Sequence, residues 1–412
     1  MPDTATLFLI FLALVFDYLN GFHDAANSIA TIVGTRVLTP NKAVIWAAFF
    51  NFVAFLIFGT HVAETIGSGI IATEIVDRTV IAAVLLAASI WDLATWYWGL
   101  PTSSSHALIG GLLGAALAKV GSIGVVWAGI WKTLAFMVIA PFVGLFIGVA
   151  VAIAVYWTFR RSSPSRVDHL FRRGQFISAA AYSLGHGGND AQKTMGVIFV
   201  LLLSLNYILP EPIQGMKVTA APAGIQVASV EGGSLAEVAH AMKGDVVVKV
   251  NSKEVKTYAD CWTGLRATKA DKIVKVTVLR AGREVELAGK KKITIPLWIV
   301  LACHLAMGLG TLGGGWRIVK TMGMKLTPLR PVDGFCAEFG AAVTLFGTGQ
   351  LGIPVSTTQT ITGSIVGVGA LKRMSAVRWG IAGRVIWAWL LTIPASALLA
   401  ILGYVLIHSF VS

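Results

Sequence analysis

Two short polar motifs occur twice in the sequence, each inside an apolar segment. The first pair is GFHDAANS at residues 21–28 and GGNDAQKT at 187–194, and the second is GLPTSSSHALIG at 99–110 and GIPVSTTQTITG at 352–363. Carboxylates, amides, lysines and runs of hydroxyls are costly in hydrocarbon and rarely lie there without a function. Their duplication predicts a transporter made of two related halves around one polar site.

The first pair of motifs supplies acids and amides. Asp24 and Asp190 offer carboxylate oxygens to a cation or a proton, and Asn27 can donate a hydrogen bond as well as accept one. Lys193 stands where the first copy has Asn27, so its ammonium either pairs with Asp190 or balances an anionic substrate. Gln192 beside it is a further predicted substrate contact. Neighbouring glycines predict that both helices unwind here, because freed backbone groups can line a cavity.

The second pair of motifs places hydroxyl residues after proline. Pro101 and Pro354 suit the first turn of a helix, where free N–H groups and the positive end of the helix dipole attract anions. Simple N-capping needs a single hydroxyl, so the tandem runs predict an oxyanion site at two helix N-termini. The hydroxyl residues are Thr102, Ser103, Ser104, Ser105, Ser356, Thr357 and Thr358.

The composition predicts a polytopic membrane protein. Hydrophobic residues make up 56% of the chain and charged residues 13%, with a mean hydropathy of +0.75, whereas soluble domains carry about 25% charged residues. Several apolar stretches reach the length of about 20 residues that a spanning helix needs. The ten predicted spans are 5–34, 43–60, 79–98, 101–118, 122–158, 175–209, 297–315, 334–351, 353–371 and 385–409.

Lys and Arg outside these spans divide unequally between the two sides. Fifteen fall on the side that holds Arg36 and residues 159–174, and only Arg78 and Lys119 fall in short loops on the other. This bias predicts a basic cytoplasmic side and extracytoplasmic termini. The net charge of +13 therefore reflects topology rather than nucleic-acid binding. Asp92 at the end of the third span is expected to face cytoplasmic water, with gating of the site as the alternative.

Alignment of the duplicated motifs defines the domain organisation. The interval from Asp190 to Pro354 exceeds that from Asp24 to Pro101 by about the length of segment 211–296. Five spans in each half is an odd number, so the halves are predicted to be inverted repeats with broken helices. The predicted parts are transmembrane half 1 (1–158), a basic cytoplasmic linker (159–174), the first span of half 2 (175–210), an extracytoplasmic insert (211–296) and the remainder of half 2 (297–412).

The insert is predicted to be a small α/β domain. Strands are expected at Gly224–Val230, Val246–Val250, 273–279 and 284–287, and helices at 234–241 and 258–267. The segment resembles a PDZ domain of the protease-associated bacterial type. The resemblance implies binding of a peptide C-terminus by strand addition at an edge, expected at 224–227. A structural or regulatory cap without a peptide ligand is the alternative.

The four motifs together resemble the inorganic phosphate transporter (PiT) family, most closely its bacterial low-affinity branch. The resemblance covers both transmembrane halves and implies symport of phosphate with protons or sodium, in some members as a complex with a divalent metal. Some relatives carry sulfate. The site residues that it implies are Asp24, Asn27, Asn189, Asp190, Ser103, Ser104, Ser105, Ser356, Thr357, Thr358 and, as an intramembrane acid, Glu338.

Two departures from the family pattern bear on the coupling ion. Sodium-coupled members usually have Asn at the position of Lys193, and bacterial members often have His at the position of Gln359. A fixed ammonium can take the electrostatic place of a sodium ion, so proton coupling is expected, with Asp24, Asp190 or Glu338 as carriers and sodium as the alternative. His23, His106 and His186 are either further titrating groups or packing donors.

The sequence therefore predicts a non-enzymatic phosphate symporter of a bacterial inner membrane that works by alternating access. No cofactor is expected. The expected partners are inorganic phosphate, the lipid bilayer and a peptide C-terminus at the insert, and a homo-oligomer is left open. The alternatives are a sulfate permease of the same fold and a membrane sensor or regulator that acts through the insert.

Overall fold

The computed structural model describes residues 2–205, 207–208, 211–221, 224–266, 273–290 and 295–411. The chain forms two compact units. A helical unit comprises Asp3–Ile198 and Leu297–Ser412, and a second unit comprises Phe199–Pro296 with Met1–Pro2.

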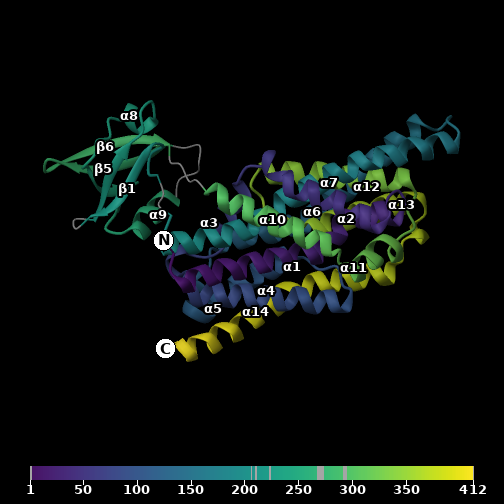
Figure 1. The fold of residues 1–412 in the computed structure, drawn as a ribbon, viewed down its shortest axis with the longest axis horizontal. Helices are drawn as coiled ribbons and strands as arrows, with labels where there is room; N and C mark the ends of the chain where they lie inside the picture. The colour runs from purple at the N-terminus through teal and green to yellow at the C-terminus, as the bar shows by residue number, and fades with distance from the viewer. Residues whose placement is uncertain are drawn as a thin grey trace. The chain divides into compact units, whose positions relative to one another are not determined.

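Long helices make up the helical unit. Those before the linker are α1 (Thr4–Gly34), α2 (Pro40–Val53), α3 (His61–Gly69), α4 (Arg78–Trp98), α5 (Ser104–Val120) and α6 (Trp127–Thr158). Those after it are α7 (Pro164–Ser204), α10 (Leu297–Gly313), α11 (Trp316–Lys320), α12 (Pro331–Gln350), α13 (Thr357–Lys372) and α14 (Trp379–Val411). Short 3₁₀ turns lie at Ala54–Leu56, Thr73–Ile75, Gly121–Gly124 and Met374–Ala376, and a π-helical turn lies at Thr321–Lys325. The start of α1 and the end of α14 lie at the same end of this unit (Figure 1).

The predicted multi-pass membrane architecture is supported by helix length and apolarity. Among the described residues, five helices are long and apolar enough to span a membrane: α1, α4, α5, α6 and α14. Two bent pairs raise the number to seven, with α2–α3 bent by 84° and α10–α11 by 61°. The expected spans 43–60 and 297–315 are thus the first parts of bent pairs. Helices α7, α12 and α13 do not meet the test.

The predicted unwinding of the first and sixth spans is wrong. Both α1 and α7 run without a break through their motifs. A Cβ atom at Gly21 would lie 2.2 Å from the Met307 carbonyl oxygen, and one at Gly187 would lie 2.4 Å from that of Asn51. These glycines let two helix backbones approach closely, as small residues do in membrane bundles.

The chain instead breaks between α4 and α5 and between α12 and α13. Within each pair the two helices pack against each other, and the connecting turns, including residues 101–103 and 352–356, are buried. The two tips approach each other at Lys193, which donates to Ser105 of one hairpin and to the carbonyl of Val355 in the other. Residues 79–98 with 101–118, and 334–351 with 353–371, therefore form helical hairpins whose tips lie inside the bundle.

An acid–lysine pair joins the two helices of each hairpin at its base. In the α4–α5 hairpin, Lys119 donates to Asp77 at 2.5 Å and to the carbonyl of Ile75 at 2.7 Å. In the α12–α13 hairpin, Lys372 donates to Asp333, which also accepts from Tyr156 of α6 at 2.5 Å. Asp333 is fully buried, whereas the Asp77 side chain is 44% exposed.

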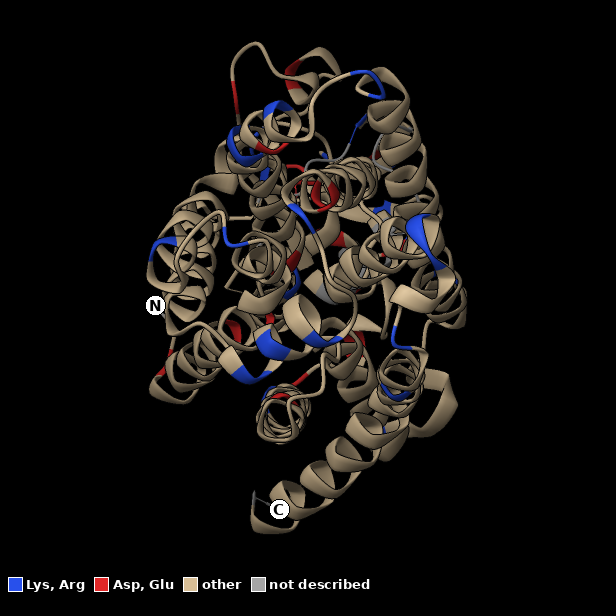
Figure 2. Cartoon of the chain, turned by 90° about the vertical axis from the view of Figure 1, so that its right-hand side faces the viewer, with Lys and Arg blue, Asp and Glu red and all other residues tan. Residues whose placement is uncertain are grey.

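The basic linker is shorter than predicted. Helix α7 begins at Pro164, so only about the first third of segment 159–174 connects α6 to α7. The rest extends α7 by Arg- and polar-rich turns, in which Arg172 pairs with Asp168 at 2.7 Å. Figure 2 views the molecule from the end opposite the chain termini, and Lys and Arg lie at several helix ends and connections there. The end of the predicted span 175–210, at 209–210, lies outside the described residues.

The second unit contains an antiparallel sheet of order β1-β2-β3-β5-β6, with β4 paired to β3. Its strands are β1 (Met216–Ala221), β2 (Gly224–Val230), β3 (Val246–Val250), β4 (Lys253–Glu254), β5 (Ile273–Arg280) and β6 (Arg283–Lys290). Two helices, α8 (Leu235–Val238) and α9 (Tyr258–Arg266), accompany the sheet. The four predicted strands are thus present. Ala267, predicted to end α9, lies outside the described residues.

The predicted peptide-binding edge at 224–227 is wrong. Strand β1 pairs with β2 along its length, with Ala221 opposite Gly224 and Val218 opposite Val227, so β2 is interior and β1 is the terminal strand. The first strand of the insert was predicted at Gly224–Val230, so β1 was missed. A fork of two hydrogen bonds from Arg280 to the buried Asp245, at 2.7 and 2.6 Å, joins β5 to the start of β3.

Candidate functional site

The two aspartate motifs meet the tip of the α12–α13 hairpin at the centre of the helical unit. Asn27 Nδ2 donates to Thr358 Oγ1 at 2.9 Å, and Thr358 Oγ1 donates to Asp24 at 3.3 Å. Thr357 Oγ1 donates to Asp190 of α7 at 2.7 Å. Residues from three separate helices therefore form one hydrogen-bonded cluster, as the repeated motifs predicted.

Lys193 joins this cluster to the other hairpin. Its ammonium contacts the carboxylate of Asp190, the hydroxyl of Ser105 and the Val355 carbonyl, the last at 2.9 Å. The side chain is only 2% exposed, and a buried charge of this kind requires compensation by such partners. Both predicted roles of Lys193 remain compatible with this geometry, because the ammonium pairs with Asp190 and lies beside both helix N-termini.

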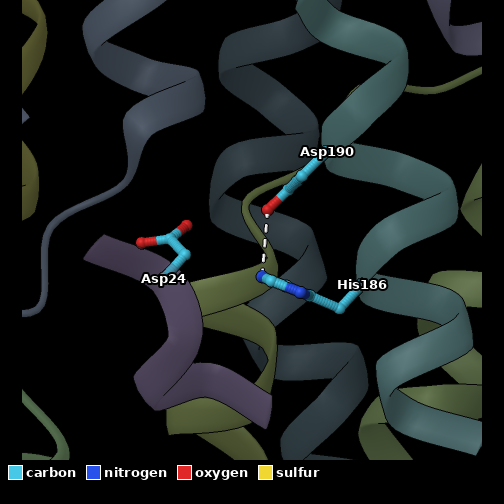
Figure 3. A group of neighbouring side chains, drawn as sticks. All are labelled: Asp24, His186 and Asp190. Atoms are coloured by element: carbon cyan, nitrogen blue, oxygen red, sulfur yellow. Dashed lines mark ion pairs between the residues drawn. The ribbon is translucent and has the colours of Figure 1, made fainter. Parts of the chain in front are cut away.

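Asp24, His186 and Asp190 form a second arrangement, of three groups that can each offer one ligand atom to a cation. One ligand atom from each lies within 4.8 Å of the others, and all three residues are buried. Figure 3 shows Asp24 on α1 beside His186 and Asp190, which both project from α7. His186 Nε2 is 3.3 Å from Asp190 Oδ2 but is not aligned for a hydrogen bond. Two carboxylates and an imidazole can hold a proton or a metal cation.

The hydroxyl runs divide into helix caps and first-turn residues. Ser103 accepts from the backbone N–H of His106 at 3.4 Å, and Ser356 accepts from that of Gln359 at 3.2 Å. These two are N-caps, while Ser104, Ser105, Thr357 and Thr358 occupy the first turns, where backbone N–H groups lack intrahelical partners. Pro101 and Pro354 precede the caps, so the prediction that they lie in the first turn of each helix is wrong.

Two residues predicted to bind the substrate are used elsewhere. Gln192 accepts from the backbone N–H groups of Val62 and Ala63 at 2.9 and 3.3 Å, which caps the first turn of α3. Asn189 donates to the carbonyls of Gly185 and Leu345 at 2.7 and 3.0 Å. Neither makes a contact with the hydroxyls of the central cluster in this conformation, because each amide satisfies a neighbouring backbone.

Glu338 lies in a separate buried cluster. Its carboxylate accepts from Thr31 of α1 at 2.5 Å, from Gln175 of α7 at 3.0 Å and from Ser178 of α7. Thr31 is four residues, about one helical turn, beyond Asn27 on α1. Glu338 is therefore a buried acid inside the bundle, on the side of the central cluster toward the end of α1.

A further polar group lies beside the α4–α5 tip and was only partly predicted from the sequence. His23 contacts Asp24 at 2.7 Å and Thr95 at 3.1 Å, and Thr102 donates to Thr95 at 2.9 Å. Asp92 is 1% exposed rather than facing water, and both of its carboxylate oxygens lack a hydrogen-bond partner within the described ranges. Its position about two turns before the break at the end of α4 was the available signal.

The polar residues of α1 and α7 form a continuous seam between two antiparallel helices. Thr194 donates to Asp17 at 2.9 Å near the start of α1. Further along, Ser28 contacts His186 at 3.2 Å. Near the end of α1, Thr35 donates to Gln175 at 2.8 Å. The central cluster therefore lies between the Asp17 contact at one end of the seam and the Glu338 cluster at the other.

The site is closed and its charges are not balanced. Asp24, Asn27, Asp190, Lys193 and Thr358 are each no more than 2% exposed. With neutral histidines, two central carboxylates face a single ammonium, which leaves net negative charge. Entry of an oxyanion would add to that charge in a medium where uncompensated charge is costly.

Comparison with known proteins places this geometry in context. The family model described as the phosphate transporter family matches residues 20–166 and 159–400, which confirms the resemblance seen in the motifs. A probable low-affinity inorganic phosphate transporter of Rhizobium meliloti is 47% identical over 396 residues, covering 96% of this chain and 94% of its own. A protein of the same description from Bacillus subtilis is 34% identical over 98% of this chain and 97% of its own.

More distant relatives agree over the full length. The low-affinity inorganic phosphate transporter PitB of Escherichia coli is 27% identical, covering 96% of each chain. A solved structure described as the sodium-dependent phosphate transporter superposes with a TM-score of 0.71 at 20% identity, over 98% of this chain and 99% of that one. This last likeness concerns the fold. The relatives are named transporters, in agreement with a protein that is not an enzyme.

Proposed function

The chain belongs to the phosphate transporter family, and on this premise we propose that it moves inorganic phosphate across a membrane by cation-coupled symport. The observation that carries the proposal is the contact of Lys193 with both hairpin tips. An ammonium between two helix N-termini rich in hydroxyls suits a tetrahedral oxyanion.

Phosphate would displace contacts that the site makes with itself. Asn27, Ser104, Ser105, Thr357, Thr358 and Lys193 are the proposed phosphate contacts, together with the free N–H groups of the first turns. Ser104 Oγ has no hydrogen-bond partner in the described part of the chain, and the Thr357 and Thr358 hydroxyls now donate to Asp190 and Asp24. Thr102, Ser103, Ser356, Asn189 and Gln192 would support the site rather than touch the anion.

Protons are the proposed coupling ion. Lys193 already supplies one fixed positive charge to Asp190, so a proton on Asp24, Asp190 or Glu338 would offset the charge of phosphate. The Asp24–His186–Asp190 group supports sodium as the competing candidate. Cotransport of a divalent metal with phosphate would use the same carboxylates, with the metal as cargo.

Several features support an inverted repeat and alternating access. Helix α5 packs on α14, and its counterpart α13 packs on α6. Pro141 lies inside α6 and Pro394 inside α14, and bent pairs occupy matching places in both halves. In each half, a hairpin that does not cross the membrane replaces two of the five predicted spans, which leaves three crossings. Because three is an odd number, the two halves still have opposite orientation and both termini still lie outside the cytoplasm. A site closed to both sides suits an occluded intermediate.

The second unit is proposed to be an extracytoplasmic PDZ-like domain. Its antiparallel sheet, its helix α9 and its hydrophobic core support a folded domain between the sixth span and α10. The proposed domain limits stay at 1–158, 175–210, 211–296 and 297–412, with the linker reduced as described. The bacterial relatives support an inner-membrane location.

Uptake into proteoliposomes tests the function. We expect radiolabelled phosphate to accumulate under an inward proton gradient without sodium, and sulfate in excess to leave that uptake unchanged. Uptake that needs sodium and ignores pH would exclude proton coupling, and equal competition by sulfate would exclude phosphate selectivity. A variant that lacks 211–296 and transports normally would exclude the sensor alternative in which the insert is the working part.

A further inference from the structure

Asp17 is a buried acid that the proposed transport site does not use. It lies on α1, is 0% exposed, and accepts one hydrogen bond, from Thr194 Oγ1 to its Oδ1 at 2.9 Å. Its Oδ2 has no hydrogen-bond partner among the residues that the structure describes. An ionised carboxylate in this condition is strongly destabilised in the bilayer interior, and such acids are rarely structural.

The neighbours of Asp17 supply no compensating cation. Asn20 and the Cys303 thiol of α10 approach the carboxyl, and Asp190 is the nearest acid on α7. The Asn20 Oδ1 is itself buried without a partner in the described residues. Lys193, the nearby cation on α7, is held by Asp190, Ser105 and the Val355 carbonyl. A proton on Oδ2 is the simplest way to neutralise Asp17.

The position of Asp17 connects it to the transport site. Asp17 and Asp24 are seven residues apart and lie on the same face of α1, two turns from each other. Thr194 lies one turn beyond Asp190 on the matching face of α7. Asp17 therefore occupies the seam between the central carboxylates and the end of the bundle that holds the chain termini.

We propose that Asp17 is a proton-binding station between that end of the bundle and the central carboxylates. The station takes a proton from water when the bundle opens at the termini end. It becomes ionised again as Asp24 or Asp190 becomes protonated, so one proton leaves and one is gained. This rests on the proposed proton coupling, and it gives the seam a station on each side of the site, Asp17 on one and Glu338 on the other.

Infrared difference spectroscopy tests the protonation of Asp17 directly, without any transport. Spectra of the full chain in lipid nanodiscs at neutral pH should contain a protonated carboxylic-acid band that is absent in Asp17→Asn. The same band should move to higher frequency in Thr194→Val, which removes the hydrogen bond to Oδ1. Identical spectra for the parent and Asp17→Asn, or loss of the band on addition of sodium at constant pH, would overturn the proposal.

Transport measurements separate the station from a structural role. In proteoliposomes, Asp17→Asn should reduce uptake driven by a pH gradient about tenfold or more, while phosphate exchange between two equal pools stays within about twofold of the parent. Asp17→Glu should restore part of the gradient-driven uptake. Equal loss of both activities means a structural role and overturns the proposal. If the parent ignores the pH gradient, proton coupling fails, and the infrared result still decides whether Asp17 holds a proton.

Discussion

Lys193 and Asp190 form an ion pair across three residues of one helix, with side-chain exposures of 2% and 0%. The pair also links two hairpins, because Lys193 donates to residues of both tips. Phosphate bound as proposed would compete with an existing carboxylate for the same ammonium. Such competition would couple anion affinity to the protonation of Asp190.

Lys193→Asn should change both affinity and ion dependence. Loss of the ammonium leaves Asp190 uncompensated, so we expect phosphate affinity without sodium to fall at least about tenfold and sodium to restore part of it. Uptake with separately varied pH and sodium measures both effects. Lys42→Asn, at an exposed helix start, is the control. Unchanged affinity and ion dependence in Lys193→Asn would remove this residue from the mechanism.

Thr358→Val should weaken phosphate binding without loss of stability. The hydroxyl contacts Asn27 and Asp24 in the central cluster, so we expect a loss of about 1.5 kcal/mol in binding, more than tenfold in affinity. Thr362→Val is the matched control, because its hydroxyl donates only to the Thr358 carbonyl of the same helix at 2.6 Å. Isothermal titration in detergent distinguishes the two, and equal affinities would place Thr358 outside the site.

Gly21→Ala should destabilise the helical unit. A Cβ atom there meets the Met307 carbonyl oxygen at 2.2 Å, so α1 and α10 must separate, at a cost of about 2 kcal/mol. Thermal unfolding in detergent measures the effect. Gly347→Ala on α12 is the control, because a Cβ atom added there would have no neighbour within 4 Å, and it should be neutral or stabilising. An unchanged unfolding temperature for Gly21→Ala would instead favour a helix able to open at this motif.

The two hairpin bases should differ in their sensitivity to loss of lysine. Lys372→Met leaves the fully buried Asp333 with the Tyr156 hydroxyl, the Arg330 N–H and, 3.9 Å away, the mostly exposed Arg330 guanidinium. The expected cost is about 3 kcal/mol. Lys119→Met removes a pair whose acid is 44% exposed, at an expected cost below about 1 kcal/mol. Chemical unfolding of both variants compares them directly. Equal losses would show that burial does not decide the contribution of these pairs.

The second unit should show a pH dependence set by Asp245. Burial raises the pKa of this carboxyl, but the Arg280 guanidinium and the Met242 N–H together lower it by more. The net result is a pKa below the ordinary value of 3.8. The stabilisation is therefore complete above about pH 4 and is lost as the pH falls through the folded-state pKa. Hydrogen exchange of β3 amides in the full chain should show faster opening on acidification in that range.

Arg280→Met should reverse this dependence. Without the guanidinium, burial leaves Asp245 with a raised pKa. The free energy of opening should therefore be lower than in the parent by about 3 kcal/mol at neutral pH. This difference should shrink as the pH falls toward 4. Lys275→Met is the control, because its pair with Glu286 is mostly exposed. A variant that opens like the parent at neutral pH would show that the fork contributes little.

The sequence predicted the architecture where local signals were strong. Strands β2 and β3 have the predicted bounds, because β-branched runs with Gly-containing turns leave few alternatives. The breaks in α1 and α7 were predicted wrongly, because Gly inside a helix signals either unwinding or close packing. Only the position of Met307 against Gly21 decides between the two.

The site was predicted at the level of motifs rather than contacts. The doubled polar motifs identified Asp24, Asp190 and Lys193. Any fold that packs the two motif copies against each other would bury these residues. Gln192 caps the first turn of α3, and no local sequence pattern predicts where α3 begins. Asp17 was missed because it lies outside the motifs. Its connection to the site becomes visible only when α7 packs on α1 and brings Thr194 to its carboxylate.

Close glycine contacts extend along the second half of α1, from Gly310 against the Tyr18 carbonyl to Gly323 against that of Ala30. A missense change in a glycine codon always inserts a larger side chain. Harmful variants of this protein should therefore include many single-base changes at glycines, both on α1 and in the segments that pack against it. Variation on the lipid-facing side of the same helix meets no such barrier, so the two faces of α1 should accumulate substitutions at very different rates.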